Sequence, residues 1–228
     1  MSKNNNNNIP KLIYITGIDG SGKSTVSEYL ADKLRSQGYE VNILWLRFNH
    51  VFSKPLLGLC RLLGYTRYEK PQGIHVGYHD FYKSKVISYL FILFQYLDAV
   101  RVKYTKIIPL YRKKNSIIIL DRYVYDILID ISVDTRLDGL FRSWIGKKFT
   151  NLLPDDSVSI LVWRELEEVL CVRPEGKVDR NFESRFKYFK ELKNSSRINT
   201  INNAGTLDEL LNVAGKLTGL DNEIKTAG

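Results

Sequence analysis

Residues 11–25 read KLIYITGIDGSGKST, and this stretch decides the fold. Its β-branched and aromatic start predicts a strand over 11–16 that ends at Gly17. The segment 17–24 then matches G-x-x-x-x-G-K-[ST] at every position, and an amphipathic helix predicted over 23–36 follows it directly. Glycines at these positions let successive backbone N–H groups turn toward phosphate oxygens, and the helix N-terminus adds partial positive charge. The stretch therefore predicts a phosphate-binding loop (P-loop) for a nucleoside triphosphate.

The residues of this loop have different expected tasks. Lys23 should reach the terminal phosphates of ATP, and Ser24 should place its hydroxyl on Mg²⁺. Asp121 follows an apolar strand, which is where such folds carry the acidic residue that helps to hold Mg²⁺. ATP and Mg²⁺ are therefore the predicted cofactors, and Ser24 and Asp121 are the predicted metal ligands. The predicted ATP-binding residues are Gly17, Asp19, Gly20, Ser21, Gly22, Lys23, Ser24 and Thr25.

Strands and helices alternate along the rest of the chain. Further strands are predicted over 40–46, 116–120, 157–163 and 197–201, and helices over 55–63, 81–111, 165–172, 181–194 and 206–217. This alternation produces right-handed crossovers and a parallel sheet. The predicted fold class is α/β, with three layers (α/β/α) around a five-stranded parallel sheet. One domain is expected over 11–228, after a disordered Asn-rich tail over 1–10.

Composition limits the class of protein. The apolar segment 86–97 has 12 residues, fewer than the about 20 that cross a bilayer, and is predicted to be a buried core helix rather than a membrane span. The formal charge of +9 attracts anions, but the basic residues are scattered and form no known nucleic-acid module, so nucleic acid is not a favoured partner. Two cysteines, Cys60 and Cys171, rule out a disulfide scaffold. With no apolar signal segment at the start, a cytoplasmic protein is expected.

Three motifs together resemble those of the thymidylate kinase family of nucleoside monophosphate kinases. They are GIDGSGKST over 17–25, LRF over 46–48 and DRY over 121–123, and the resemblance spans most of 11–217. It implies a P-loop kinase fold and an enzyme of nucleotide biosynthesis that transfers the γ-phosphoryl group of ATP to dTMP or a related nucleotide. It also implies a substrate site: Asp19 near the acceptor's sugar, Arg47 on its phosphate, Arg101 beside its base, and Arg122 as the arginine of the family's Asp-Arg pair.

The resemblance implies two further features. Members of the family are commonly dimers, so the apolar face of the long helix could form a homodimer, although burial within one chain explains that face equally well. The segment 173–180 resembles the family's mobile LID loop. Gly20 stands where some members carry a basic residue, so charge in the transition state must be stabilised from elsewhere. The predicted catalytic residues are Lys23, Arg122, Arg173 and Arg180.

The acceptor side departs from the family's pattern and leaves alternatives open. Asn49 and His50 replace the usual Glu-Pro pair, Leu97 stands where an aromatic is expected, and Tyr104 replaces a glutamine. A kinase of the same fold that acts on a nucleoside or a sugar alcohol is therefore one alternative. The net positive charge leaves a nucleotide-dependent switch or ATPase as another. Against it, the sequence has no Asn-Lys-x-Asp signature, and Arg122 follows Asp121 where an ATPase would carry its base.

Overall fold

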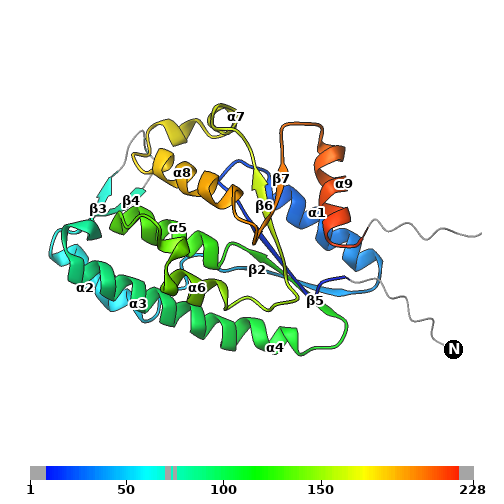
Figure 1. Cartoon of the computed structure of the whole chain (residues 1–228), viewed down its shortest axis with the longest axis horizontal. Coiled ribbons are helices and arrows are strands. Elements are labelled where there is room, and N and C mark those ends of the chain that lie inside the picture. Colours follow the sequence, from blue (N-terminus) through cyan, green and yellow to red (C-terminus); the bar gives the residue numbers. More distant parts are fainter. Residues whose placement is uncertain (1–8, 70–72, 74–75, 221–228) are drawn as a thin grey trace, which may run out of the picture.

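A computed structural model describes residues 9–69, 73 and 76–220 of the chain (Figure 1). Its central sheet has five strands in the order β2-β5-β1-β6-β7, and every neighbouring pair is parallel. The strands are β1 (Leu12–Thr16), β2 (Glu40–Trp45), β5 (Ser116–Asp121), β6 (Val158–Trp163) and β7 (Asn199–Asn202). The predicted α/β fold with a five-stranded parallel sheet is confirmed. Of the predicted tail, residues 1–8 lie outside the described part of the chain.

Helices cover both faces of the sheet, because alternate side chains of its inner strands point to opposite faces. Ile13 and Ile15 of β1 pack with α1 (Lys23–Ser36) and α9 (Leu207–Leu217) in one apolar cluster. Leu12 and Tyr14 belong to the cluster on the other face. The helices of that face are α3 (Lys85–Val102), α5 (Val124–Thr135), α6 (Trp144–Thr150) and α8 (Phe182–Lys193). The arrangement gives the three predicted layers.

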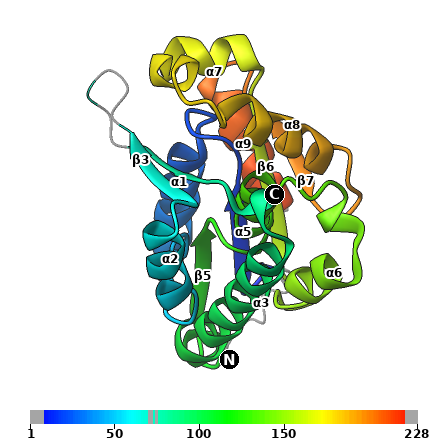
Figure 2. The ribbon, with the colours of Figure 1, turned by 90° about the vertical axis from the view of Figure 1, so that its left-hand side faces the viewer.

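The remaining elements lie at the margins of these layers. A helix, α2 (Ser53–Leu62), follows β2 and leads into an antiparallel hairpin of β3 (Thr66–Glu69) and β4 (Val76–His79). Another helix, α7 (Leu166–Val172), follows β6. Short 3-10 turns occupy Phe81–Lys83, Leu140–Arg142 and Pro174–Lys177. Figure 2 shows α5 between α3 and α8.

The long helix predicted over 81–111 is interrupted. After α3 the chain forms a π-helical turn over Lys103–Ile107 and then a short helix, α4 (Ile108–Tyr111), with Pro109 in its first turn. Proline is tolerated there because the first N–H groups of a helix have no intrahelical partner. The expectation that 86–97 is buried on all sides is wrong: α3 packs one face on the core, whereas Val86 and Tyr89 are more than 60% exposed. None of the described helices combines the length and apolar character needed to cross a membrane.

The β3–β4 hairpin and the helices α5 and α6 were not predicted. Each hairpin strand has four residues, of which one is buried, so its sequence lacks a clear apolar alternation. Helix α5 begins directly after the DRY motif and carries an aspartate at every fourth position, Asp126, Asp130 and Asp134. Acidic residues on a buried helix face interrupt the apolar periodicity by which a helix is usually recognised.

Candidate functional site

The loop between β1 and α1 has the conformation that its glycines allow. Gly17 and Gly22 have φ angles of 147° and 102°. A Cβ atom on Gly17 would lie 2.4 Å from the carbonyl oxygen of Val162, so no larger residue fits. Gly22 is the N-cap of α1, and no side chain caps the helix there. The N–H groups at the start of α1 therefore remain available to an anion.

Lys23 is buried beside this loop, and among the described residues its nearest carboxylate is that of Asp19. Its Nζ donates a hydrogen bond of 2.8 Å to the carbonyl of Ile18 and lies 3.8 Å from Oδ1 of Asp19. Burial, and then the positive charge of Arg122, lower the pKa of Lys23 to about 8. A polyphosphate in the loop would supply the negative charge that this ammonium group lacks.

A cavity of about 530 Å³ opens over the loop, and we call it the loop cavity. The P-loop residues that line it are Asp19, Gly20, Gly22, Lys23, Ser24 and Thr25. Two lining residues from other strands brace the loop and were not predicted. Arg164, just after β6, donates to the carbonyl of Gly20 at 3.3 Å, and Asn203, just after β7, donates to that of Ser21 at 2.8 Å. Both follow strand ends, where parallel sheets bind ligands.

The predicted Mg²⁺ ligands both line the loop cavity. Ser24 is exposed, and Oδ1 of Asp121 is buried without a hydrogen-bond partner among the residues that the structure describes. Burial and the charges of nearby carboxylates raise the pKa of Asp121, so this group would gain from a cation. In the described part of the chain, no three His, Cys, Asp or Glu side chains form a metal cluster. The residues fit a Mg²⁺ that takes its other ligands from nucleotide phosphates and water.

A second cavity of about 400 Å³, the central cavity, lies between α5, α8 and the loop. Asp19, Arg122 and Arg173 line both this cavity and the loop cavity. Arg122 forms an ion pair with Asp19, and its Nη1 donates to Oδ1 of Asp126 at 3.3 Å. Arg173 lies over the loop, because a Cβ atom on Gly20 would be 2.8 Å from its Cγ. The two cavities therefore meet at two arginines and one carboxylate.

Arg47 lines the central cavity and is held in place by Asp130 of α5. Its Nε and Nη2 donate to the two carboxylate oxygens of Asp130 at 3.0 and 2.8 Å, and its Nη1 lies 3.8 Å from Asp19. Burial alone would lower the pKa of Arg47, but the charge and hydrogen bonds of Asp130 raise it well above the ordinary value. A two-point contact of this kind fixes the orientation of the guanidinium plane.

Several side chains of the central cavity were not predicted. Asp126 accepts hydrogen bonds from Tyr14 at 2.8 Å and Thr16 at 2.9 Å, and so ties α5 to β1. Arg185 of α8 pairs with Asp179 at 2.6 Å and lies 3.6 Å from Asp130. The aspartates could have been found from their spacing of four residues, which places them on one face of a helix. The pairing with α8 has no local signal in the sequence.

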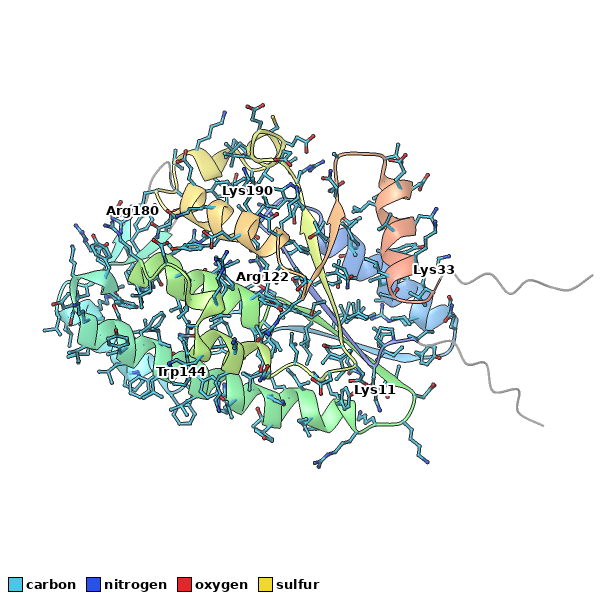
Figure 3. All side chains as sticks on the ribbon, in the orientation of Figure 1. Lys11, Lys33, Arg122, Trp144, Arg180 and Lys190 are labelled. Carbon is cyan, nitrogen blue, oxygen red and sulfur yellow. The ribbon has the colours of Figure 1, made fainter. Side chains whose placement is uncertain are left out.

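Two of the predicted site residues lie elsewhere. Arg101 donates to the carbonyl of Asn49 at 3.3 Å and lines neither cavity. Arg180 donates to Asp80 at 3.0 Å and stacks 4.0 Å over the ring of Tyr78, also outside both cavities. Figure 3 shows Arg180 well apart from Arg122. Of the segment 173–180, which contains a 3-10 turn, the structure therefore brings Arg173 but not Arg180 to the P-loop.

The comparison with known families agrees with this geometry at the loop. The sequence model of the adenylylsulphate kinase family matches residues 9–72. A search of curated proteins finds no match. The matched segment includes β1, the P-loop, α1 and β2, but not α5 or α8. With the sheet order and the loop, it shows a P-loop kinase fold. It points to a different kinase family from the one that the three motifs resemble.

Proposed function

We propose that the protein is an ATP-dependent phosphotransferase, which moves the γ-phosphoryl group of ATP onto a small acceptor in the central cavity. One observation carries the proposal: the two cavities share Asp19, Arg122 and Arg173. ATP bound on the P-loop would present its terminal phosphate to this junction. A nucleoside triphosphatase needs only the loop cavity, whereas a kinase needs a second cavity beside it.

The donor side would act through the loop and Lys23. Backbone N–H groups and Lys23 would bind the β- and γ-phosphates, while Ser24 and Asp121 would hold Mg²⁺. Bound there, Mg²⁺ would neutralise charge on the phosphate oxygens. These groups are positioned before ATP arrives, so little reorganisation accompanies the reaction.

The transfer itself would rely on Arg122 and Arg173. As the bond between the γ-phosphorus and ADP breaks and a bond to the acceptor oxygen forms, negative charge spreads over the transferring group. Guanidinium groups at the junction would stabilise that charge. Arg173 also lies over the P-loop at Gly20, so its segment is placed to keep water from the phosphate.

The acceptor would be a nucleoside monophosphate, dTMP or a related nucleotide. Arg47 has a fixed guanidinium plane on the central cavity, which suits the recognition of a phosphate. The three motifs support the same class of acceptor. The adenylylsulphate kinase match covers the donor-side elements and leaves α5 and α8 outside, so it bears on ATP binding more than on the acceptor.

An acceptor panel tests this proposal. The protein is incubated with Mg²⁺ and ATP radiolabelled at its γ-phosphate, together with dTMP, thymidine, adenylylsulphate or no acceptor, and the labelled products are separated. We expect label on dTMP and ADP formation that depends on it. The Lys23→Met variant is the negative control.

The other outcomes separate the alternatives. Label on adenylylsulphate alone would assign the chain to the chemistry of the family that matches residues 9–72. Label on thymidine but not dTMP would make it a nucleoside kinase. ADP formation at the same rate without any acceptor would contradict phosphotransfer and favour an ATPase.

The proposal includes a cellular location. We place the enzyme in the cytoplasm, where both free cysteines, Cys60 and Cys171, would remain reduced.

We also propose a homodimer through the exposed apolar side chains of α3, such as Val86, Tyr89 and Leu93. The mass of the protein in solution, measured by light scattering, tests the dimer.

A further inference from the structure

A third cavity of about 220 Å³ adjoins the central cavity, and we call it the inner cavity. Arg47, Asp130 and Arg185 line both of them. Apolar side chains from α3 and α5 form part of its wall: Phe91, Ile127 and Ile131. A molecule whose phosphate lay beside Arg47 could therefore extend its other end between these apolar groups.

One polar side chain of the inner cavity lacks a partner. Asp134, in the last turn of α5, is 7% exposed and lines the cavity. It makes no hydrogen bond or ion pair with any residue that the structure describes, and only charges at longer range act on it. The other two aspartates of this helix face are fully engaged, Asp126 by Tyr14 and Thr16 and Asp130 by Arg47. A buried polar group without a partner is rare and needs an explanation.

The environment of Asp134 favours its neutral form. Burial, and then the negative charge of Asp130, raise the pKa of Asp134 well above its ordinary value. A protonated carboxyl group presents one O–H donor and one carbonyl acceptor side by side. Such a group pairs best with an edge that offers the complementary acceptor and donor on adjacent atoms.

The other polar groups of the inner cavity are also uncharged or tied down. His50 is held by hydrogen bonds of 2.9 Å to Ser53 and to Gln95, and His79 by one of 2.9 Å to Thr66. Burial lowers the pKa of both histidines, that of His79 to about 4. The charged groups, Arg47, Asp130 and Arg185, are engaged in ion pairs. A charged ligand group would find no free counter-charge here, so the cavity suits a neutral polar ring.

We propose that Asp134 is a specificity-determining residue that reads the edge of an uncharged heterocycle on the acceptor. The heterocycle carries a hydrogen-bond donor and an acceptor on adjacent atoms, as in the lactam edge of thymine or the amidine edge of cytosine. Its faces pack against Phe91, Ile127 and Ile131, and its edge forms two hydrogen bonds with the carboxyl group. This inference rests on the proposed function, because it assumes that the acceptor's phosphate lies beside Arg47.

Equilibrium binding to the full chain tests the inference without requiring phosphotransfer. Isothermal titration measures the affinity of dTMP, dCMP and 2-deoxyribose 5-phosphate, which has the sugar phosphate but no ring. We expect at least one nucleotide to bind more tightly than the sugar phosphate, by about tenfold or more. The nucleotide gains two hydrogen bonds and buries its ring, and the sugar phosphate can do neither. Whether dTMP or dCMP binds better tells the lactam edge from the amidine edge.

Two substitutions of Asp134 then identify its role. Asp134→Asn keeps a donor and an acceptor side by side, so nucleotide affinity should stay within about threefold. Asp134→Leu removes both and should weaken nucleotide binding about tenfold or more, with the affinities of 2-deoxyribose 5-phosphate and ATP unchanged. Asp32→Leu, on the outer face of α1, is the control for loss of an exposed carboxylate and should change nothing.

The possible failures are distinguishable. Equal loss in Asp134→Asn and Asp134→Leu would contradict a neutral donor–acceptor group, and unchanged affinity in Asp134→Leu would remove Asp134 from the site. Nucleotides that bind no better than 2-deoxyribose 5-phosphate would also overturn the inference. If the nucleotides bind as expected but receive no phosphoryl group from ATP, the proposed function fails while the recognition by Asp134 stands.

Discussion

The loop cavity and the central cavity differ in how the chain builds them. Six residues that line the loop cavity come from one short segment, 19–25, whose backbone is shaped by glycines. The central cavity is formed by side chains from distant segments, among them Arg47, Arg122, Asp130 and Arg185. The loop depends on local conformation, whereas the central cavity depends on tertiary packing.

The two cavities also differ in their charge balance. Lys23, on the loop cavity, is buried, and no carboxylate in the described part of the chain lies closer to it than 3.8 Å. Arginines of the central cavity are already paired, Arg47 with Asp130, Arg122 with Asp19 and Arg185 with Asp179. The loop is therefore prepared for a strongly anionic ligand. In the central cavity the carboxylates hold the arginines in fixed directions, so that site selects its ligand by geometry as well as by charge.

The strongest effect should come from the packing on which the central cavity depends. Asp126→Ala removes a buried carboxylate that binds Tyr14, Thr16 and Arg122, so the free energy of unfolding should fall by about 3–5 kcal/mol. Urea denaturation measures it. Asp134→Leu, two turns along the same helix, is the matched comparison: with no partner to lose, it should be neutral or stabilising. Similar losses in both variants would mean that Asp126 and Asp134 contribute equally to stability.

The loop cavity should be sensitive in catalysis rather than in folding. Lys23→Met should reduce kcat for phosphotransfer by about 10²- to 10³-fold, because one preorganised positive group at the phosphates is lost. Circular dichroism should show an unchanged fold. Lys33→Met, on an exposed position of the same helix and far from Arg122 in Figure 3, should have no effect. Near-normal turnover in Lys23→Met would remove the loop from the reaction.

Substitution of Arg47 should affect the binding of the acceptor but not that of ATP. Arg47→Ala should raise KM for a phosphorylated acceptor by about 10- to 100-fold, because it removes charged hydrogen bonds, while KM for ATP stays the same. Arg47→Lys keeps the charge but not the two-point geometry. Its KM for the phosphorylated acceptor should lie between those of the unsubstituted protein and of Arg47→Ala. Steady-state kinetics with each substrate varied in turn measures this. An equal rise in both KM values would indicate a general distortion of the fold.

The smallest expected effect is a dependence of stability and of ATP binding on pH, caused by the titration of Lys23. Because its pKa is about 8 in the folded chain and 10.5 ordinarily, the folded state binds fewer protons between these values. Raising the pH through that window should therefore stabilise the free protein, and it should weaken ATP binding as the ammonium group loses its proton. Urea denaturation and titration calorimetry, each compared with Lys23→Met, isolate both trends. Parallel pH profiles in the two proteins would show that Lys23 does not change its protonation state in this pH window.

The sequence predicted what depends on local conformation. Helix α1 has the predicted bounds, Lys23–Ser36, and α9 (Leu207–Leu217) lies within the predicted range 206–217, with reciprocal hydrogen bonds between Thr206 and Glu209 at its start. The five strands of the central sheet, of which β1, β5 and β6 are buried, were recognised because β-branched runs bounded by turns have few alternatives. The P-loop was recognisable because its conformation depends on glycines and a lysine at fixed positions in one short segment, although the side chains of Arg164 and Asn203 that brace it come from other strands.

The rest of the site depends on partners that local patterns do not reveal. Nothing near Arg47 in the sequence indicates that Asp130 will fix its orientation, since 83 residues separate them. Likewise, Arg101 follows a family spacing, yet it bonds to Asn49 because the helix places it outside the cavity. The register of α3 against α5 decides which side chains face the acceptor, and that register is a property of tertiary packing.

The central claim is that the loop cavity and the central cavity hold two substrates end to end. It can be tested with a single molecule in which adenosine and thymidine are joined through a polyphosphate chain that carries the phosphates of both substrates. Titration calorimetry should show that this molecule binds at least about 100-fold more tightly than ATP, because linking the two ligands makes the second contact intramolecular. Arg47→Ala and Lys23→Met should each weaken it. Binding no tighter than that of ATP, and unaffected by Arg47→Ala, would contradict the account.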